Sequence, residues 1–120
     1  MKTIIYSCGG DTTSQQLVEN TAEMGVDVYF PETIRIGDSI MPLLEWEQVA
    51  LLPNLIGKRI VTVSEIIILM FLREVRKGRM RTDELELYCD GRRIGMSTDG
   101  SMIDPWDGGF FETGINLRFD

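Results

Sequence analysis

The alternation of strand-like and helix-like segments constrains the fold more than any other feature of the sequence. Runs rich in β-branched or aromatic residues predict strands at residues 3–6, 26–30, 58–63 and 85–89. Helices are predicted in the gaps between these strands, at residues 13–24, 41–52 and 65–77. Strands that alternate with helices are typical of a mainly parallel sheet with flanking helices, so the sequence predicts the α/β class.

The last predicted strand leads into a reversal of the chain. Asp90-Gly91 is a common two-residue hairpin turn, and residues 92–97 can return along residues 85–89. Asp99-Gly100 marks another reversal. We therefore expect a C-terminal antiparallel β-hairpin at the edge of the parallel sheet.

Turn and capping residues set the predicted ends of the helices. Gly25 and Gly78 end the first and third helices, because glycine readily adopts the left-handed conformation that often follows a helix. Residues 33–39 are expected to be a connection. Within it, Gly37-Asp38-Ser39 is expected to cap the second helix, with Pro42 in the first helical turn.

The length and composition are those of one globular unit. A chain of 120 residues, with 43% hydrophobic and 26% charged residues, is long enough to bury one core without metals or disulfides. No linker or repeat divides it, so we expect residues 1–120 to form a single α/β domain. The tail at residues 103–119 is rich in glycine and aromatic residues. We expect it to pack as an ordered loop through Trp106, Phe110 and Phe111.

Charge, hydropathy and cysteine content exclude several classes of partner. The 12 basic and 19 acidic residues give a net charge of -7, which repels the phosphate backbone of nucleic acids. The longest apolar run, residues 66–72, is far shorter than the roughly 20 residues that span a bilayer. Cys8 and Cys89 are distant in sequence and no secretion signal precedes them, which predicts reduced thiols in the cytoplasm. We expect no general nucleic-acid binding and no membrane role.

One basic run departs from the acidic average. It consists of Arg73, Arg76, Lys77, Arg79 and Arg81, with Glu74 as the only acid among them. The simpler interpretation is a solvated face that complements the negative end of the helix dipole. The alternative is a docking site for an acidic partner.

The absence of histidine excludes more chemistry than any other feature. It excludes imidazole acid–base catalysis, histidine-activated nucleophiles and histidine metal sites. The phosphate-binding pattern GxxxxGKS/T is missing as well. The loop Gly9-Gly10-Asp11 follows a strand but carries no lysine, and its aspartate disfavours a phosphate. We therefore expect no catalytic residues, cofactor or metal.

Cys8 is the one candidate nucleophile. It lies near the start of the first helix, where the helix dipole lowers the pKa of a thiol. No general base is close in sequence, and Asp11 opposes a thiolate, so the sequence favours a small buried residue at a strand end. The tail carboxylates are a candidate acidic site, although a solvated loop is the simpler interpretation. They belong to Asp104, Asp107 and Glu112.

Several motifs in the second half of the chain occur in a fixed order. Thr62-Val63-Ser64-Glu65 ends a predicted strand and opens a helix whose last residues are 73–78, and Gly108-Gly109-Phe110-Phe111 follows the hairpin. This order resembles the C-terminal lobe of ATPases with ABC-type heads, the RecF- and SMC-like group often described as AAA-family ATPases. Upstream, residues 26–32 are similar to the family's second conserved strand. Gly9-Gly10 would then correspond to the signature loop that touches nucleotide on the opposite head.

Departures from the family pattern imply that catalysis has been lost. Val63 replaces the switch histidine, Tyr29 or Phe30 replaces the acidic residue that orients the attacking water, and the lobe with the P-loop is absent. Phosphoryl transfer depends on those parts. The resemblance therefore implies a degenerate lobe that binds proteins, either an intact ATPase head or a second copy in a homodimer. The basic run and the tail aromatics Trp106, Phe110 and Phe111 are its expected contact residues.

A second resemblance implies an enzyme. The cysteine-phosphorylated B components of sugar phosphotransferase systems begin with a strand, a cysteine, a loop of small residues and a helix. Cys8 and Thr13-Ser14 match that beginning loosely. The loop is about one residue too short, and that family has no counterpart of the hairpin or of Phe110-Phe111. This resemblance implies the alternative function, phosphotransfer on Cys8.

Overall fold

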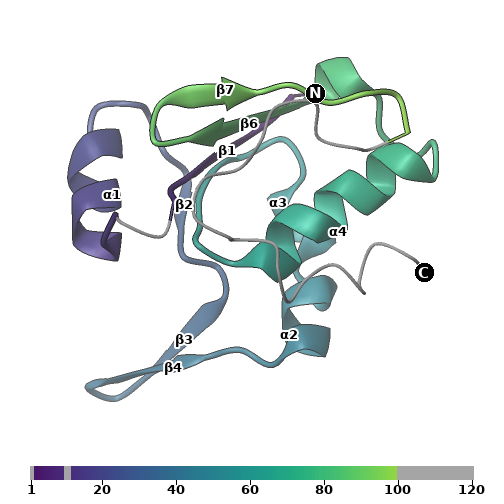
Figure 1. The fold of residues 1–120 in the computed structure, drawn as a ribbon. Coiled ribbons are helices and arrows are strands. Elements are labelled where there is room, and N and C mark those ends of the chain that lie inside the picture. Colours follow the sequence, from purple (N-terminus) through teal and green to yellow (C-terminus); the bar gives the residue numbers. More distant parts are fainter. Residues whose placement is uncertain (1, 10–11, 100–120) are drawn as a thin grey trace.

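In the computed structural model, which describes residues 2–9 and 12–99, strands and helices alternate along the chain (Figure 1). Within these residues, the main sheet has the spatial order β2-β5-β1-β6-β7. Its strands are β1 (Thr3–Ser7), β2 (Val28–Tyr29), β5 (Arg59–Val61), β6 (Leu85–Cys89) and β7 (Arg92–Ile94). β1 is parallel to β5 and β6, and β2 is parallel to β5, whereas β7 is antiparallel to β6. The predicted α/β class, with a C-terminal antiparallel hairpin, is confirmed.

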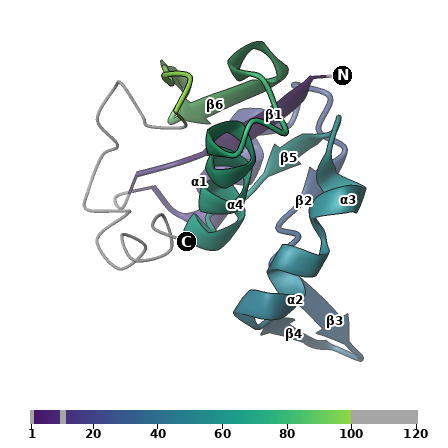
Figure 2. The ribbon, with the colours of Figure 1, turned by 90° about the vertical axis from the view of Figure 1, so that its right-hand side faces the viewer.

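The two longer helices cover opposite faces of this sheet. Ile5 of β1 lies opposite Ile60 and Leu87 in the neighbouring strands, so these side chains share one face. That face packs against α4 (Glu65–Arg76) in the main core. On the other face, Leu17 of α1 (Ser14–Thr21) packs against Val61. Figures 1 and 2 show α1 and α4 on the two sides of the sheet.

Local capping explains where these helices begin and end. The Thr13 hydroxyl accepts a hydrogen bond from the Gln16 N–H at 3.1 Å, and the Ser64 hydroxyl accepts one from the Ile67 N–H at 3.3 Å. Each bond satisfies a donor that has no partner within the helix. Gly78 follows α4 with a φ of +76°, which glycine adopts without steric cost. Both predicted helices are therefore present, although α1 ends at Thr21 with Ala22 as its C-cap and not at Gly25.

Residues 33–42 form a β-hairpin, and the predicted connection and helix cap are wrong here. β3 (Thr33–Ile36) pairs with β4 (Ser39–Pro42) in a separate antiparallel sheet. Gly37 opens the two-residue turn with a φ of +60°. A type II′ hairpin turn requires this conformation at its first position, which favours glycine. Gly37-Asp38 is thus a hairpin turn, and Pro42 ends a strand.

The second predicted helix begins later and is divided into two short pieces. The first is α2 (Glu45–Ala50), and the second is α3 (Leu52–Leu55). Pro53 lies in the first turn of α3, where its missing N–H costs nothing, so it is compatible with the start of this helix. α2 packs beside α4, and the hairpin extends from the domain next to α2 (Figure 2). In the part of the chain described, no helix has both the length and the apolar character of a bilayer span.

Candidate functional site

The carboxyl ends of β1 and β5 are the first place to look for a ligand. The helices that follow these adjacent strands cover opposite sheet faces, and such a switch point leaves a crevice where α/β proteins commonly bind ligands. The described residues at these two strand ends include Cys8, Gly9 and Thr12 after β1, and Thr62 and Ser64 after β5.

Asp90 accepts hydrogen bonds from two described donors of the loop after β1. Its Oδ2 atom accepts a hydrogen bond from the Gly9 N–H at 2.9 Å, and its Oδ1 atom accepts one from the Thr12 hydroxyl at 2.8 Å. The Asp90 N–H donates to the Ser7 carbonyl at 3.0 Å. A phosphate-binding loop needs such donors free for the ligand. Here the Asp90 carboxylate accepts these hydrogen bonds in place of a ligand.

Cys8 lies beside this contact and is buried, with only 3% of its surface exposed. Its thiol donates to the Thr12 carbonyl at 3.6 Å. Burial raises the pKa of the Cys8 thiol above its ordinary value, and Asp90 and Cys89 raise it further. A nucleophilic cysteine needs a lowered pKa, so these surroundings oppose thiolate formation. Cys8 packs with the α1 side of the sheet and Cys89 with the α4 core.

A buried polar network fills the end of β5. The Thr62 hydroxyl donates to Glu32 Oε2 at 2.8 Å and accepts from the Ser64 N–H at 3.1 Å. The Ser64 hydroxyl donates to Gln48 Oε1 at 2.5 Å, and the Gln48 amide donates to the Leu43 carbonyl at 3.0 Å. Glu32 and Ser64 belong to the segments that resemble ATPase motifs. In this structure, Glu32 is bonded to Thr62 at the end of β5, and Ser64 at the start of α4 is bonded to Gln48 of α2.

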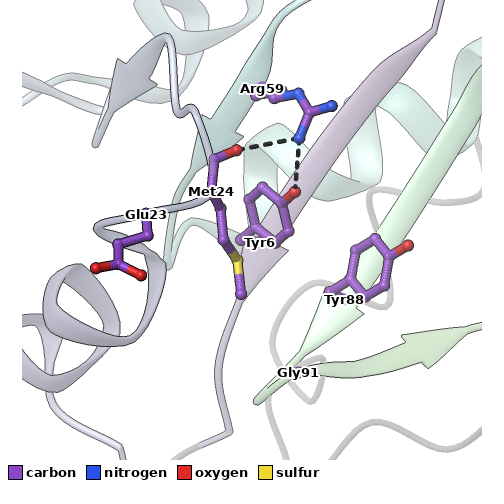
Figure 3. Close-up of a pocket in the computed structure, with 6 residues that line it drawn as sticks. All are labelled: Tyr6, Glu23, Met24, Arg59, Tyr88 and Gly91. Carbon is purple, nitrogen blue, oxygen red and sulfur yellow. Dashed lines mark hydrogen bonds between the residues drawn. The ribbon is translucent and has the colours of Figure 1, made fainter.

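An open pocket of about 370 Å³ lies on the α1 side of the sheet (Figure 3). The rings of Tyr6 and Tyr88 stack in it at a centroid distance of 5.4 Å. Arg59 Nη1 donates to the Met24 carbonyl at 3.0 Å and to the Tyr6 hydroxyl at 3.4 Å, which fixes the guanidinium. Figure 3 shows the Glu23 carboxylate pointing away from it. Sequence reasoning missed this pocket, because strand tyrosines carry no motif.

The largest exposed apolar feature of the described residues lies on the hairpin and α2. Ten large hydrophobic residues are exposed in the described chain, and seven of them fall between residues 34 and 49. We call these seven the hairpin–α2 surface: Ile34, Ile36, Ile40, Met41, Leu44, Trp46 and Val49. Ile40 is 71% exposed and Trp46 is 69% exposed. Large exposed apolar residues that gather in one segment often mark an interaction site on a protein.

The basic run predicted as a contact surface lies at and after the C-terminal end of α4. Arg73 and Arg76 lie in the last turn of α4, followed by Lys77 at its C-cap. Arg79 pairs with Glu74, whose hydrogen bond raises the pKa of Arg79. Arg81 pairs with Asp83 and Glu84, at 3.1 Å and 3.5 Å, in the short 3₁₀ helix η1 (Thr82–Glu84). Local acids thus offset part of the basic run.

The remaining predicted site residues lie outside the described part of the chain. They are Trp106, Phe110 and Phe111, and the acidic residues Asp104, Asp107 and Glu112. Among the described residues, no group of three or more cysteine, aspartate or glutamate side chains is placed to hold a metal ion. Comparison of the chain with protein-family models, with curated proteins and with solved structures gives no match.

Proposed function

We propose that this chain is a non-catalytic binding protein that acts through protein–protein contacts, with the hairpin–α2 surface as its contact surface. The supporting observation is the clustering of exposed apolar residues in one short segment. Trp46 is the natural anchor, because tryptophan carries a large share of the binding energy in many interfaces. Full burial of a side chain such as Ile40 contributes about 1.5–3 kcal/mol.

The hairpin itself gains little from the rest of the domain, which further supports this proposal. β3 and β4 form a separate sheet that does not join the main one in the described chain. An isolated two-stranded hairpin is at best marginally stable in water, and a third strand or a packed face stabilises it. A partner that covers the hairpin supplies that missing support.

The contacts at the carboxyl ends of β1 and β5 weigh against catalysis as the main activity. Asp90 accepts hydrogen bonds from the Gly9 N–H and the Thr12 hydroxyl, two donors that a phosphate could otherwise use, and the raised pKa of Cys8 disfavours the alternative function of phosphotransfer on that thiol. The resemblance to ATPase lobes supports two kinds of partner, an intact ATPase head or a second copy of this chain. In either case the chain modulates its partner by binding.

Site-specific photo-crosslinking in the native cell tests this function without knowledge of the partner. A photoreactive amino acid replaces Ile40 in one variant and Val18 in the control. Val18 is an exposed hydrophobic residue on α1, at 37% exposure. We expect a discrete crosslinked protein from position 40 and none from position 18. Absence of any protein adduct at position 40 would contradict the proposal.

A further inference from the structure

The open pocket of Figure 3 lies on the sheet face that α1 covers only in part. Leu17 of α1 packs against the buried Val61, whereas Tyr6 of β1 and Tyr88 of β6 are only partly buried. Tyr6 is directly opposite Tyr88 in the parallel register, so the two stacked rings line the pocket together. The pocket volume of about 370 Å³ falls within the range of about 300–1,000 Å³ that is typical of small-molecule sites.

Both tyrosine rings are held in place through their hydroxyl groups. The Tyr6 hydroxyl accepts a hydrogen bond from Arg59 Nη1 at 3.4 Å, and the Tyr88 hydroxyl donates to Glu86 Oε1 at 2.7 Å. Glu86 is in turn paired with Lys2. Side chains that are already fixed lose little conformational freedom when a ligand binds, so the site is largely preformed.

The apolar groups that line the pocket favour a flat aromatic ligand. Tyrosine rings attract another ring in offset or edge-to-face contacts. Met24 also lines the pocket and is 41% exposed, and a thioether makes favourable contacts with the edge of an aromatic ring. Gly91, in the turn between β6 and β7, lines the pocket without a side chain that would fill it.

Arg59 supplies a positive charge at the same pocket. Its Nη1 atom is used by the Met24 carbonyl and the Tyr6 hydroxyl, but no described residue accepts a hydrogen bond from its Nη2 atom. Among residues 2–9 and 12–99, no carboxylate forms an ion pair with this guanidinium. The guanidinium is therefore oriented by the protein and keeps donors for a ligand.

The carboxylates around Arg59 have other partners or point elsewhere. Asp27 Oδ2 accepts a hydrogen bond from the Arg59 backbone N–H at 2.9 Å, and Glu86 is bonded to Lys2 and Tyr88 as described above. Glu23 lines the pocket, but Figure 3 shows its carboxylate pointing away from Arg59. The net charge of -7 disfavours a highly charged anion, so a single negative charge suits this pocket better than a phosphate dianion.

The geometry points to a binding site for a small aromatic carboxylate. The ring of the ligand packs against Tyr6, Tyr88 and Met24, and its carboxylate accepts a hydrogen bond from Arg59 Nη2. A guanidinium and a carboxylate are both planar, and the charge on each strengthens the hydrogen bond between them. The pocket contains no residue of the hairpin–α2 surface, so this site is independent of the proposed contact surface.

Titration of the full chain with 2-naphthoate, followed by the NMR signals of the backbone amides, tests this site. We expect saturable shifts at positions 6, 24 and 88, with a dissociation constant of about 1 mM or lower, and none in residues 33–42. The compound 2-naphthylmethanol has the ring without the charge, and cyclohexanecarboxylate has the charge without the aromatic ring. Each should bind at least about tenfold more weakly. This comparison uses the wild-type chain alone, so it does not depend on the folding of a variant.

Matched variants assign the binding to the pocket residues. Arg59→Gln should raise the dissociation constant for 2-naphthoate at least about tenfold, whereas Lys58→Gln removes the same charge one position away and should leave it unchanged. Tyr88→Leu should weaken binding, and Tyr29→Leu removes an exposed tyrosine outside the pocket as its control. The amide spectrum of each variant shows that it is folded.

Three results would overturn the site. They are the absence of saturable shifts at positions 6, 24 and 88 up to about 10 mM 2-naphthoate, equal affinity for 2-naphthylmethanol, and equal effects of Arg59→Gln and Lys58→Gln. None of them changes the expected crosslink at position 40, so failure of this site and failure of the proposed function are distinguishable.

Discussion

Asp90 and Gly9 are joined by a hydrogen bond of 2.9 Å, although they lie 81 positions apart in the sequence. The turn between β6 and β7 therefore holds the loop that follows β1. Asp90 has a φ of +52°, a conformation that aspartate and asparagine tolerate better than most residues. The same residue thus forms the hairpin turn and closes the loop where an α/β protein would admit a ligand.

Replacement of Asp90 tests how much this contact stabilises the domain. Asp90→Ala removes the acceptor for Gly9 and Thr12 and places alanine at a positive φ. We expect it to lower the free energy of unfolding by about 1–3 kcal/mol. Asp90→Asn tolerates the backbone conformation and keeps one acceptor, so its loss is smaller. Urea unfolding measures both, and equal stability of Asp90→Ala and wild type would refute the contact's role.

Thiol reactivity tests the environment of Cys8. Because burial, Asp90 and Cys89 raise its pKa, we expect the folded chain to react with iodoacetamide far more slowly than the urea-unfolded chain at neutral pH. The unfolded thiol loses its proton first, so the contribution of Cys8 to stability is constant below the unfolded pKa and is lost as pH rises toward the folded pKa. Fast modification of Cys8 in the folded protein would revive the phosphotransfer alternative.

Local signals were sufficient for some elements and misleading for one. The Ser64 cap, Gly78 and Asp90-Gly91 act on neighbouring residues, so the sequence predicted α4 and the last hairpin correctly. Residues 37–42 contain both a hairpin turn and the Ser and Pro of a helix start. The serine and proline led to the prediction of a helix. In the structure, the alternating apolar residues around Ile34 and Ile40 lie on paired strands.

The contacts of the candidate sites were less accessible to sequence reasoning. Asp90 meets Gly9, and Thr62 meets Glu32, only after the sheet forms, and no local pattern encodes such pairs. The exposure of Ile40 and Trp46 is likewise not encoded locally, because apolar residues are mostly buried and a sequence pattern does not show which ones stay exposed.

The Thr62–Glu32 bond offers a test of the buried network. Thr62→Val keeps the shape of the side chain but removes the hydroxyl that donates to the buried Glu32 carboxylate. We expect a loss of about 1–3 kcal/mol in the free energy of unfolding. Thr62→Ser keeps the hydroxyl and serves as the control. If Thr62→Val is as stable as the wild type in urea unfolding, the bond contributes nothing.

Acid unfolding tests the pairing of Glu86. A hydrogen bond from Lys2, at 2.5 Å, and a second from Tyr88 hold the pKa of the Glu86 carboxyl below its ordinary value. The stability that it contributes is complete above the unfolded pKa, near 4.3, and is lost as pH falls through the lowered folded pKa. We expect Glu86→Gln to flatten this part of the curve of unfolding free energy against pH. An unchanged curve would exclude Glu86 as its source.

Hydrogen exchange of residues 33–42 tests the central claim most directly, because it reports whether the hairpin depends on a partner. In the dilute, monomeric chain, we expect these amides to exchange at least about tenfold faster than those of β1, since the hairpin lies outside the main core. In a complex, through a second copy or another protein, they should slow while β1 stays unchanged. The proposal that the hairpin binds a partner would be contradicted if its amides were fully protected from exchange in the dilute chain, or if their exchange rates did not change in the complex.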